Sequence, residues 1–153
     1  MLREQYQMLK SSRELLFTFL STVYTADFIS ENSGFGKGSI RNLLVHIADT
    51  YASWIGEKAL KKEMLFETHV SFPNIDSCIV YFERIDGYVE SFINQYESNL
   101  YKEIEILRNE QILMISPIKL FTHVITHEFH HKGQIMSLCR HLNYTPIDAD
   151  IIQ

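Results

Sequence analysis

Four of the seven histidines in this chain fall between positions 123 and 131: His123, His127, His130 and His131. Residues four apart on an α-helix differ by about 40° in direction and by roughly 6 Å in height. His123, His127 and His131 would therefore form one stripe, whereas His130 would point elsewhere, toward solvent. Two imidazoles at positions i and i+4 can both reach one metal ion, at metal–nitrogen distances of about 2.0–2.1 Å. The spacing predicts that His127 and His131 form a metal-binding pair.

A third ligand is expected from another helix, and His46 is the best candidate. It lies among Leu43, Leu44 and Ile47, on a face that is otherwise apolar. A lone histidine there would more often be an ordinary core residue, but a ready histidine pair elsewhere favours metal binding. A buried imidazole without partners costs free energy, and metal binding to its neutral form removes that cost. We predict that His46, His127 and His131 bind one divalent metal ion, and that His69 and His141 lie at the surface.

The run from His127 to His131 also satisfies the His-Glu-x-x-His pattern of helical zinc proteases, with Glu128 as the general base. The pattern is short, and no third ligand follows His131 at the usual metalloprotease spacings. A small helical protein also lacks an obvious edge strand for a peptide substrate. A protease is therefore the weaker interpretation.

The elements that must position these residues are mainly helices. Apolar residues recur at helical spacing over roughly 2–24, 40–55, 73–93 and 117–142. Ser39 is the expected N-cap of the second segment and Ser116 that of the fourth, where Pro117 suits the first helical position. The third is expected to begin near Pro73, in its first turn.

Two stretches between these segments read differently. Residues 32–38 contain three glycines and predict a loop, without the pattern of a phosphate-binding loop. Polar and apolar residues alternate over 103–106, residues 108–110 could form a turn, and residues 112–115 are wholly apolar. This pattern predicts a small hairpin, with an extended loop as the alternative. The expected fold is all-α: one domain over residues 1–153, a four-helix bundle with the metal site between facing helices.

Composition limits the partners and the compartment. The net charge is −5, with 14 Lys and Arg against 19 Asp and Glu, which argues against nucleic acid. We see no secretory signal and no apolar stretch of the roughly 18 residues that a membrane span needs. The two cysteines, Cys78 and Cys139, are too few for a disulfide framework and are expected as buried thiols. We therefore expect a cytoplasmic protein without membrane contact.

Two pieces of the sequence resemble the DinB/YfiT-like superfamily of metalloenzymes. Residues 38–46, GSIRNLLVH, are similar to the start of that family's second helix. Residues 127–134, HEFHHKGQ, look like the family's H-x-x-H-H-R-G-Q type of signature. The order, the spacing and the coarse helix pattern agree over nearly the whole chain.

The resemblance implies a four-helix bundle, often a homodimer, with one metal held by three histidines; in this chain they are His46, His127 and His131. Some members use small thiols such as bacillithiol or mycothiol as co-substrates, and many have no assigned reaction. Lys132 stands where the family commonly has arginine, and lysine cannot make the same planar, bidentate contact with an acidic substrate or partner. The family also tolerates other residues at Glu128, so a salt bridge or a supporting contact suits that residue better than a general base.

Three neutral imidazoles leave an open position and the full charge on the ion, which suits acidifying a bound water or binding a thiol as thiolate. Our leading hypothesis is thiol-dependent transfer to a small-molecule substrate. The alternatives are a metal-dependent hydrolase, a non-enzymatic metal-binding stress protein, and a dimerisation module with incidental histidines. Zinc is the default ion, with nickel or manganese as the other candidates. His123, Tyr51 and Gln134 are further candidates for cavity or supporting residues.

Overall fold

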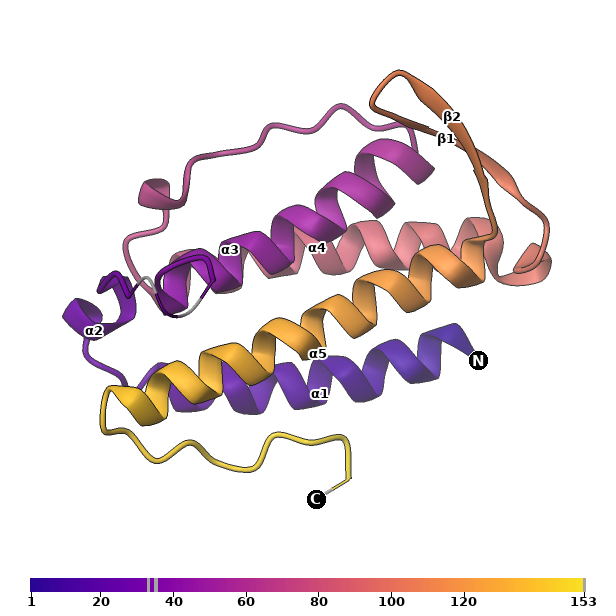
Figure 1. Cartoon of the computed structure of the whole chain (residues 1–153). Coiled ribbons are helices and arrows are strands. Elements are labelled where there is room, and N and C mark those ends of the chain that lie inside the picture. Colours follow the sequence, from indigo (N-terminus) through magenta and orange to yellow (C-terminus); the bar gives the residue numbers. More distant parts are fainter. Residues whose placement is uncertain (33, 35, 153) are drawn as a thin grey trace.

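Long helices lying alongside one another make up most of the structure (Figure 1). The computed structural model describes residues 1–32, 34 and 36–152. The long helices are α1 (Leu2–Leu20), α3 (Ile40–Tyr51), α4 (Ile75–Tyr96) and α5 (Pro117–His141). Helix α3 packs against both α4 and α5, and α1 packs against α4. The predicted helical fold class is therefore confirmed in its broad form.

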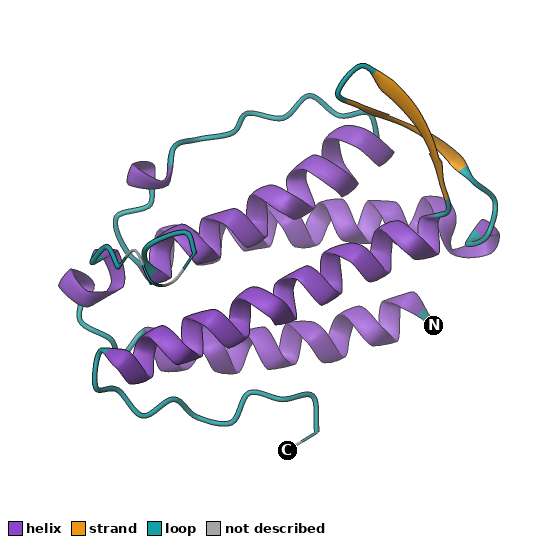
Figure 2. Cartoon of the chain, viewed as in Figure 1, coloured by secondary structure: helices purple, strands orange, loops and turns teal. Residues whose placement is uncertain are grey.

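Shorter elements connect the long helices (Figure 2). They are α2 (Thr25–Ile29), the π-helix η1 (Ala52–Ala59), the 3₁₀ turns η2 (His69–Ser71) and η3 (Glu97–Asn99), and the strands β1 (Ile104–Arg108) and β2 (Gln111–Ile115). Because η1 follows α3 without a break, the helix that carries His46 continues to Ala59 with a wider turn.

The long helices begin at or near the predicted residues, but the predicted capping hydrogen bonds are not all present. The Ser39 hydroxyl accepts a hydrogen bond from the Asn42 N–H at 3.0 Å and caps α3, as predicted. Ser116 and Pro117 do begin α5, but the Ser116 side chain makes no capping hydrogen bond, so that part of the prediction was wrong. Helix α4 begins at Ile75, two residues after Pro73, because Asn74 and Ser77 form a reciprocal capping box there.

The first helix is shorter than its apolar pattern predicts. It ends at Leu20, and the N–H groups of Thr22 and Val23 bond to the carbonyls three residues earlier. Val23 is buried although it lies outside the helix, which explains why the pattern runs on past the helix end. The short helix α2 that follows was not predicted. The predicted loop at 32–38 includes Ser33 and Phe35, which lie outside the described residues.

The predicted hairpin is confirmed. Strands β1 and β2 are antiparallel, with Ile104 opposite Ile115 and Arg108 opposite Gln111. The turn residues Asn109 and Glu110 both have positive φ, 48° and 62°. Two such residues in succession are the mark of a turn whose twist matches that of the flanking strands. The hairpin stands at the N-terminal end of α5 (Figure 1).

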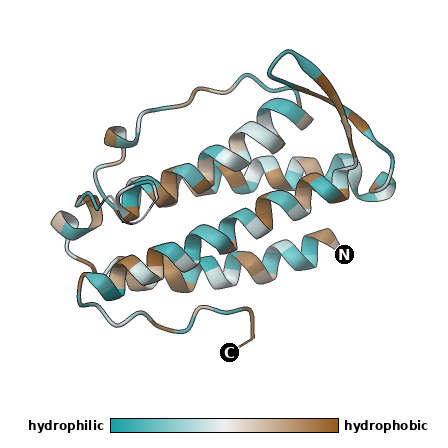
Figure 3. Cartoon of the chain, in the orientation of Figure 1, coloured by the Kyte–Doolittle hydropathy of each residue, from teal (hydrophilic) through white to brown (hydrophobic). Residues whose placement is uncertain are grey.

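Apolar and polar residues alternate along the long helices, as expected for helices with one buried face (Figure 3). The neighbours of His46 in α3, namely Leu43, Leu44 and Ile47, are almost fully buried, so this histidine is held on a rigid element. Cys78 and Cys139 are buried free thiols, as predicted. Among the described residues, no helix combines the length and the apolar character that crossing a membrane requires.

The Ser39 cap gives a test of how α3 is positioned. Replacing Ser39 by alanine should destabilise the protein by about 1 kcal/mol, because the partly buried Asn42 N–H loses its acceptor. S116A is the matched control and should change stability by less than about 0.5 kcal/mol, since its hydroxyl makes no capping bond. Urea unfolding of both variants measures the difference. Equal destabilisation by the two substitutions would contradict the assigned roles of the two serines.

Candidate metal centre

Three histidine rings from α3 and α5 meet between those helices. The Nε2 atom of His127 lies 3.2 Å from Nε2 of His46 and 3.1 Å from Nε2 of His131. One nitrogen from each ring lies within 4.8 Å of the other two. The three predicted ligands therefore lie together, and His127 and His131, four residues apart on α5, present neighbouring nitrogens.

The spacing of the nitrogen atoms fits a metal ion. Ligands held tetrahedrally at about 2.0–2.1 Å from a zinc ion lie about 3.3 Å from one another. The observed separations of 3.1 and 3.2 Å are close to that value. In the tautomer that carries the hydrogen on Nδ1, each ring directs its Nε2 lone pair toward the other two, and a cation among them would satisfy all three.

Gln134 fixes the proton on one of the rings. Nδ1 of His131 lies 2.7 Å from Oε1 of Gln134, and because an amide oxygen only accepts, Nδ1 carries the hydrogen. The lone pair of His131 is then on Nε2, which faces the other two rings. Supporting hydrogen bonds of this kind orient metal ligands in proteins. By contrast, Nδ1 of His127 is buried without a hydrogen-bond partner among the described residues.

Burial keeps the three imidazoles neutral. It lowers the pKa of His46 and of His127 to about 4, and it also lowers the pKa of His131. The positive charge of Lys37, which lines the same cavity as His46, further lowers the pKa of His46 and His131. Neutral imidazole is the form that binds metal ions.

The remaining histidines lie outside the cluster. His123 is one turn before His127 on α5, but its ring packs against Trp54, with centroids 5.2 Å apart, and it is absent from the group of converging nitrogens. His130 is exposed, as predicted, and so are His69 and His141. His69 nevertheless lines a cavity next to His46.

That cavity has a volume of about 430 Å³ and a mixed polar lining. Besides His46 and His69 it is lined by Lys37, Asn42, Val45, Asp49, Glu67 and Thr68. Asn42 and Asp49 were not predicted as site residues. They stand four residues before and three residues after His46, which places them on the same face of α3 as His46. Nothing in the local sequence connects residues 67–69 or Lys37 with this helix.

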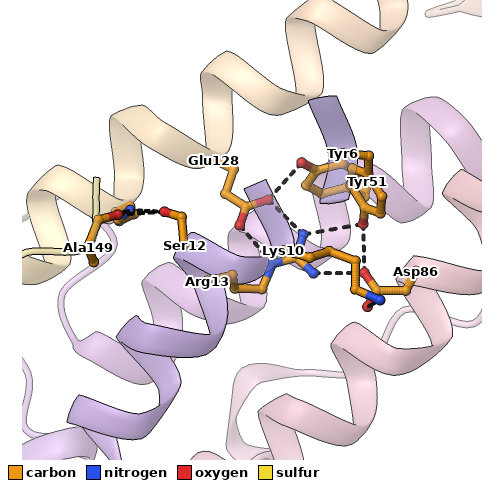
Figure 4. Close-up of polar contacts among 9 residues, drawn as sticks. Tyr6, Lys10, Ser12, Arg13, Tyr51, Asp86, Glu128 and Ala149 are labelled. Carbon is orange, nitrogen blue, oxygen red and sulfur yellow. Dashed lines mark hydrogen bonds and ion pairs between the residues drawn. The ribbon is translucent and has the colours of Figure 1, made fainter. Parts of the chain in front are cut away.

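Glu128 lies on the other side of α5, in a buried ionic network (Figure 4). Its two carboxylate oxygens accept hydrogen bonds from Nε and Nη2 of Arg13 at 2.7 and 2.9 Å. One of them also accepts the Tyr51 hydroxyl at 2.7 Å. Arg13 donates further to Asp86 at 2.7 Å. The expected structural salt bridge is confirmed, and the carboxylate is engaged away from the three histidines, which argues against a general base.

Lys132 contacts the chain's own C-terminal segment. Its ammonium group donates to the Ser12 hydroxyl and to the carbonyl oxygen of Ala149, and it lies 4.9 Å from the centre of the Phe129 ring. Burial lowers the pKa of Lys132. Lys132 stands where the family that the sequence resembles commonly has arginine. In this chain it ties Ala149 to α1 and α5.

The ionic network predicts a large effect for a small change at Glu128. E128Q should destabilise the protein by about 3 kcal/mol, because it leaves the buried Arg13 guanidinium short of negative charge. Y51F removes only one hydroxyl donor from the same carboxylate and should cost about 1 kcal/mol. Urea unfolding at pH 7 compares the two. Similar losses in E128Q and Y51F would show that the ion pair is unimportant.

The lowered histidine pKa values predict an acid-sensitive metal-free protein. Between pH 6.5 and about 4 the unfolded chain takes up protons that folded His46 and His127 exclude, so stability should fall as the pH is lowered through this window. The free energy of unfolding, measured against pH in the presence of a chelator, tests this. H46Q and H127Q should flatten the profile, because each removes a histidine whose protonation the folded state opposes. A steep profile retained in H46Q and H127Q would place the responsible groups elsewhere.

Comparison with known proteins identifies the family of the chain. The chain is 23% identical over 141 residues to the uncharacterized protein YizA of Bacillus subtilis (strain 168), an alignment that covers 92% of this chain and 87% of YizA. The model of the DinB family matches residues 1–153. The chain belongs to the DinB family.

Proposed function

We propose that this protein is a metal-dependent enzyme that uses a small thiol to carry out group transfer on a small-molecule electrophile. The observation that carries the proposal is the convergence of the His46, His127 and His131 Nε2 atoms. Membership of the DinB family and the adjoining cavity support it. The ligand set consists of three neutral imidazoles, which leaves room for an exchangeable ligand.

A divalent ion held by these histidines supplies a positive charge that favours the deprotonated form of a thiol. Zinc is our first choice, and nickel or manganese are the alternatives, because imidazole suits several of these ions. Gln134 holds the His131 ring in the tautomer that presents Nε2 to the cluster. The Thr50 hydroxyl, which donates to the His46 carbonyl, lies 3.5 Å from Nε2 of His127 and limits the movement of that ring.

The cavity beside His46 would hold the reactants. Lys37 offers a positive charge to an acidic group on the thiol or its partner substrate, and Asn42 offers hydrogen bonds. In the reaction the thiol loses its proton, and the sulfur forms a bond to the electrophilic carbon. The leaving group departs with the electron pair of the broken bond and takes up a proton. Asp49 and His69 are titratable groups of the lining that can relay this proton.

We further propose the finer features expected from the sequence. The packed long helices form a four-helix bundle within one domain, and the protein works as a cytoplasmic homodimer on small molecules. The packing of α3 against α4 and α5, and of α1 against α4, supports a four-helix bundle.

Metal content tests the site before any substrate is chosen. Elemental analysis of the purified protein should find about one divalent ion per chain, and H46A and H131A should each lose it. Q134A should retain all three ligands but bind the ion about 10–100-fold more weakly. H130A, next to a ligand but exposed, is the matched control and should keep the metal. Metal bound equally by all four variants would refute the site.

Turnover then tests the reaction. The metal-loaded protein, assayed with a panel of electrophiles, should consume them only when a small thiol is present, and H127A should be inactive. Turnover that needs the metal but no thiol would contradict thiol-dependent transfer and favour a metal-dependent hydrolase. Full metal binding without turnover of any pair would leave a metal-binding protein and remove the enzymatic proposal.

A further inference from the structure

A second site lies along the same interface between α3 and α5, beyond the histidine cluster. Residues spaced by four on each helix face one another there. They are His46, Thr50 and Trp54 on α3 and η1, and His131, His127, His123 and Lys119 on α5. Contacts between the two rows continue from Thr50 with His127 to the ring of Trp54 with that of His123. With a rise of 1.5 Å per residue, Trp54 lies about 12 Å along the helix from His46.

A pocket of about 300 Å³ opens at this far end of the interface. One part of its lining is the indole of Trp54, and another is aliphatic, from Leu113, Ile115 and Leu120. The strand β2 of the hairpin contributes Leu113 and Ile115, so the pocket lies between the hairpin and the two helices. Its volume is at the lower end of the range for small-molecule sites. The lining suits a flat or compact apolar group.

The charged residues of the pocket are all positive. Arg108 and Lys119 both line it, and its lining includes no aspartate or glutamate. Within the described part of the chain neither Arg108 nor Lys119 forms an ion pair. The Arg108 guanidinium lies over the Trp54 ring, 5.3 Å from the ring centre. The planar face of the guanidinium therefore contacts the indole, and its N–H groups remain available to donate hydrogen bonds to a ligand.

The backbone around the pocket holds these groups in place. The Lys61 ammonium, just after η1, donates to the carbonyl oxygen of Glu105 at 3.0 Å and so ties β1 to the end of the π-helix. Trp54 itself stands on η1, whose wider turn is rare in proteins and is frequently found at functional sites. The pocket is therefore built from fixed elements.

We propose that this pocket binds an organic carboxylate with a compact apolar body. The apolar body packs on Trp54 and the aliphatic side chains, and the carboxylate is held by Arg108 and Lys119 through charge-assisted hydrogen bonds. The cavity beside His46 differs, because its lining includes Asp49 and Glu67. Binding in the pocket requires neither the metal nor the transfer reaction, so this proposal stands independently of the proposed function.

Trp54 is the single tryptophan of the chain, so its fluorescence reports on the pocket directly. Phenylacetate is the probe, and phenylacetamide is its neutral match in shape. Titration of the metal-free protein with phenylacetate should give a saturable change, with affinity about tenfold weaker for phenylacetamide because the charge-assisted bonds are lost. H46Q should bind phenylacetate as the wild type does, which separates this site from the metal centre.

R108Q and K119Q should each weaken phenylacetate binding by about tenfold. Dissociation constants rather than amplitudes are compared, because removing Arg108 alters the starting fluorescence of Trp54. R140Q, the same charge change at an exposed residue of α5 outside the pocket, should leave the affinity unchanged. No saturable change with phenylacetate would overturn the proposal. Equal affinity for phenylacetamide, or for R108Q and R140Q, would overturn the assignment of a carboxylate.

Discussion

The buried ion pair between Arg13 and Glu128 is the interaction on which the arrangement of the helices depends. Both side chains are 4–6% exposed, and the carboxylate is satisfied by the guanidinium of α1 and the hydroxyl of Tyr51 from α3. Such a pair contributes little net stability, because its desolvation offsets much of its attraction. It does select one rotation of α5, since any other would leave a charge buried without a partner.

That choice of rotation determines where the histidines lie. Successive residues on an α-helix are about 100° apart, so turning Glu128 toward α1 turns the adjacent His127 and, one turn on, His131 toward α3. Helix α5 thus separates two kinds of polar site. On one side Glu128 is paired with Arg13, which also bonds to Asp86; on the other side the neutral histidines lie beside a cavity. The separation allows the histidines to stay uncharged although a buried carboxylate is the next residue in the chain.

The sequence predicted the parts of this protein that depend on local regularity. The His127 and His131 pair follows from helical spacing, and His46 from an apolar face that a polar residue interrupts. The start of α3 follows from the Ser39 cap, that of α5 follows from Pro117 at the first helical position, and the hairpin follows from its alternation. What escaped prediction depends on contacts between distant segments. Arg13 reads as an ordinary helical arginine until Glu128 is placed opposite it, and His69 reads as a loop residue until the chain brings it beside His46.

Local patterns also failed where the backbone leaves the α-helical period. Val23 continues an apolar stripe from outside its helix, and η1 prolongs α3 with a different hydrogen-bond pattern. In both places the apolar side chains stay buried while the backbone conformation changes, so hydrophobic periodicity alone cannot predict the change.

The π-helix has a consequence for how relatives of this chain are compared. Gain or loss of one residue between Thr50 and Trp54 would rotate Trp54 by about 100° about the helix axis and leave His46 where it is. The part of the helix before η1 and the part within it can therefore diverge separately in evolution. An alignment that forbids a gap there would pair tryptophan with residues facing another direction, and would make two homologous helices look unrelated beyond Tyr51.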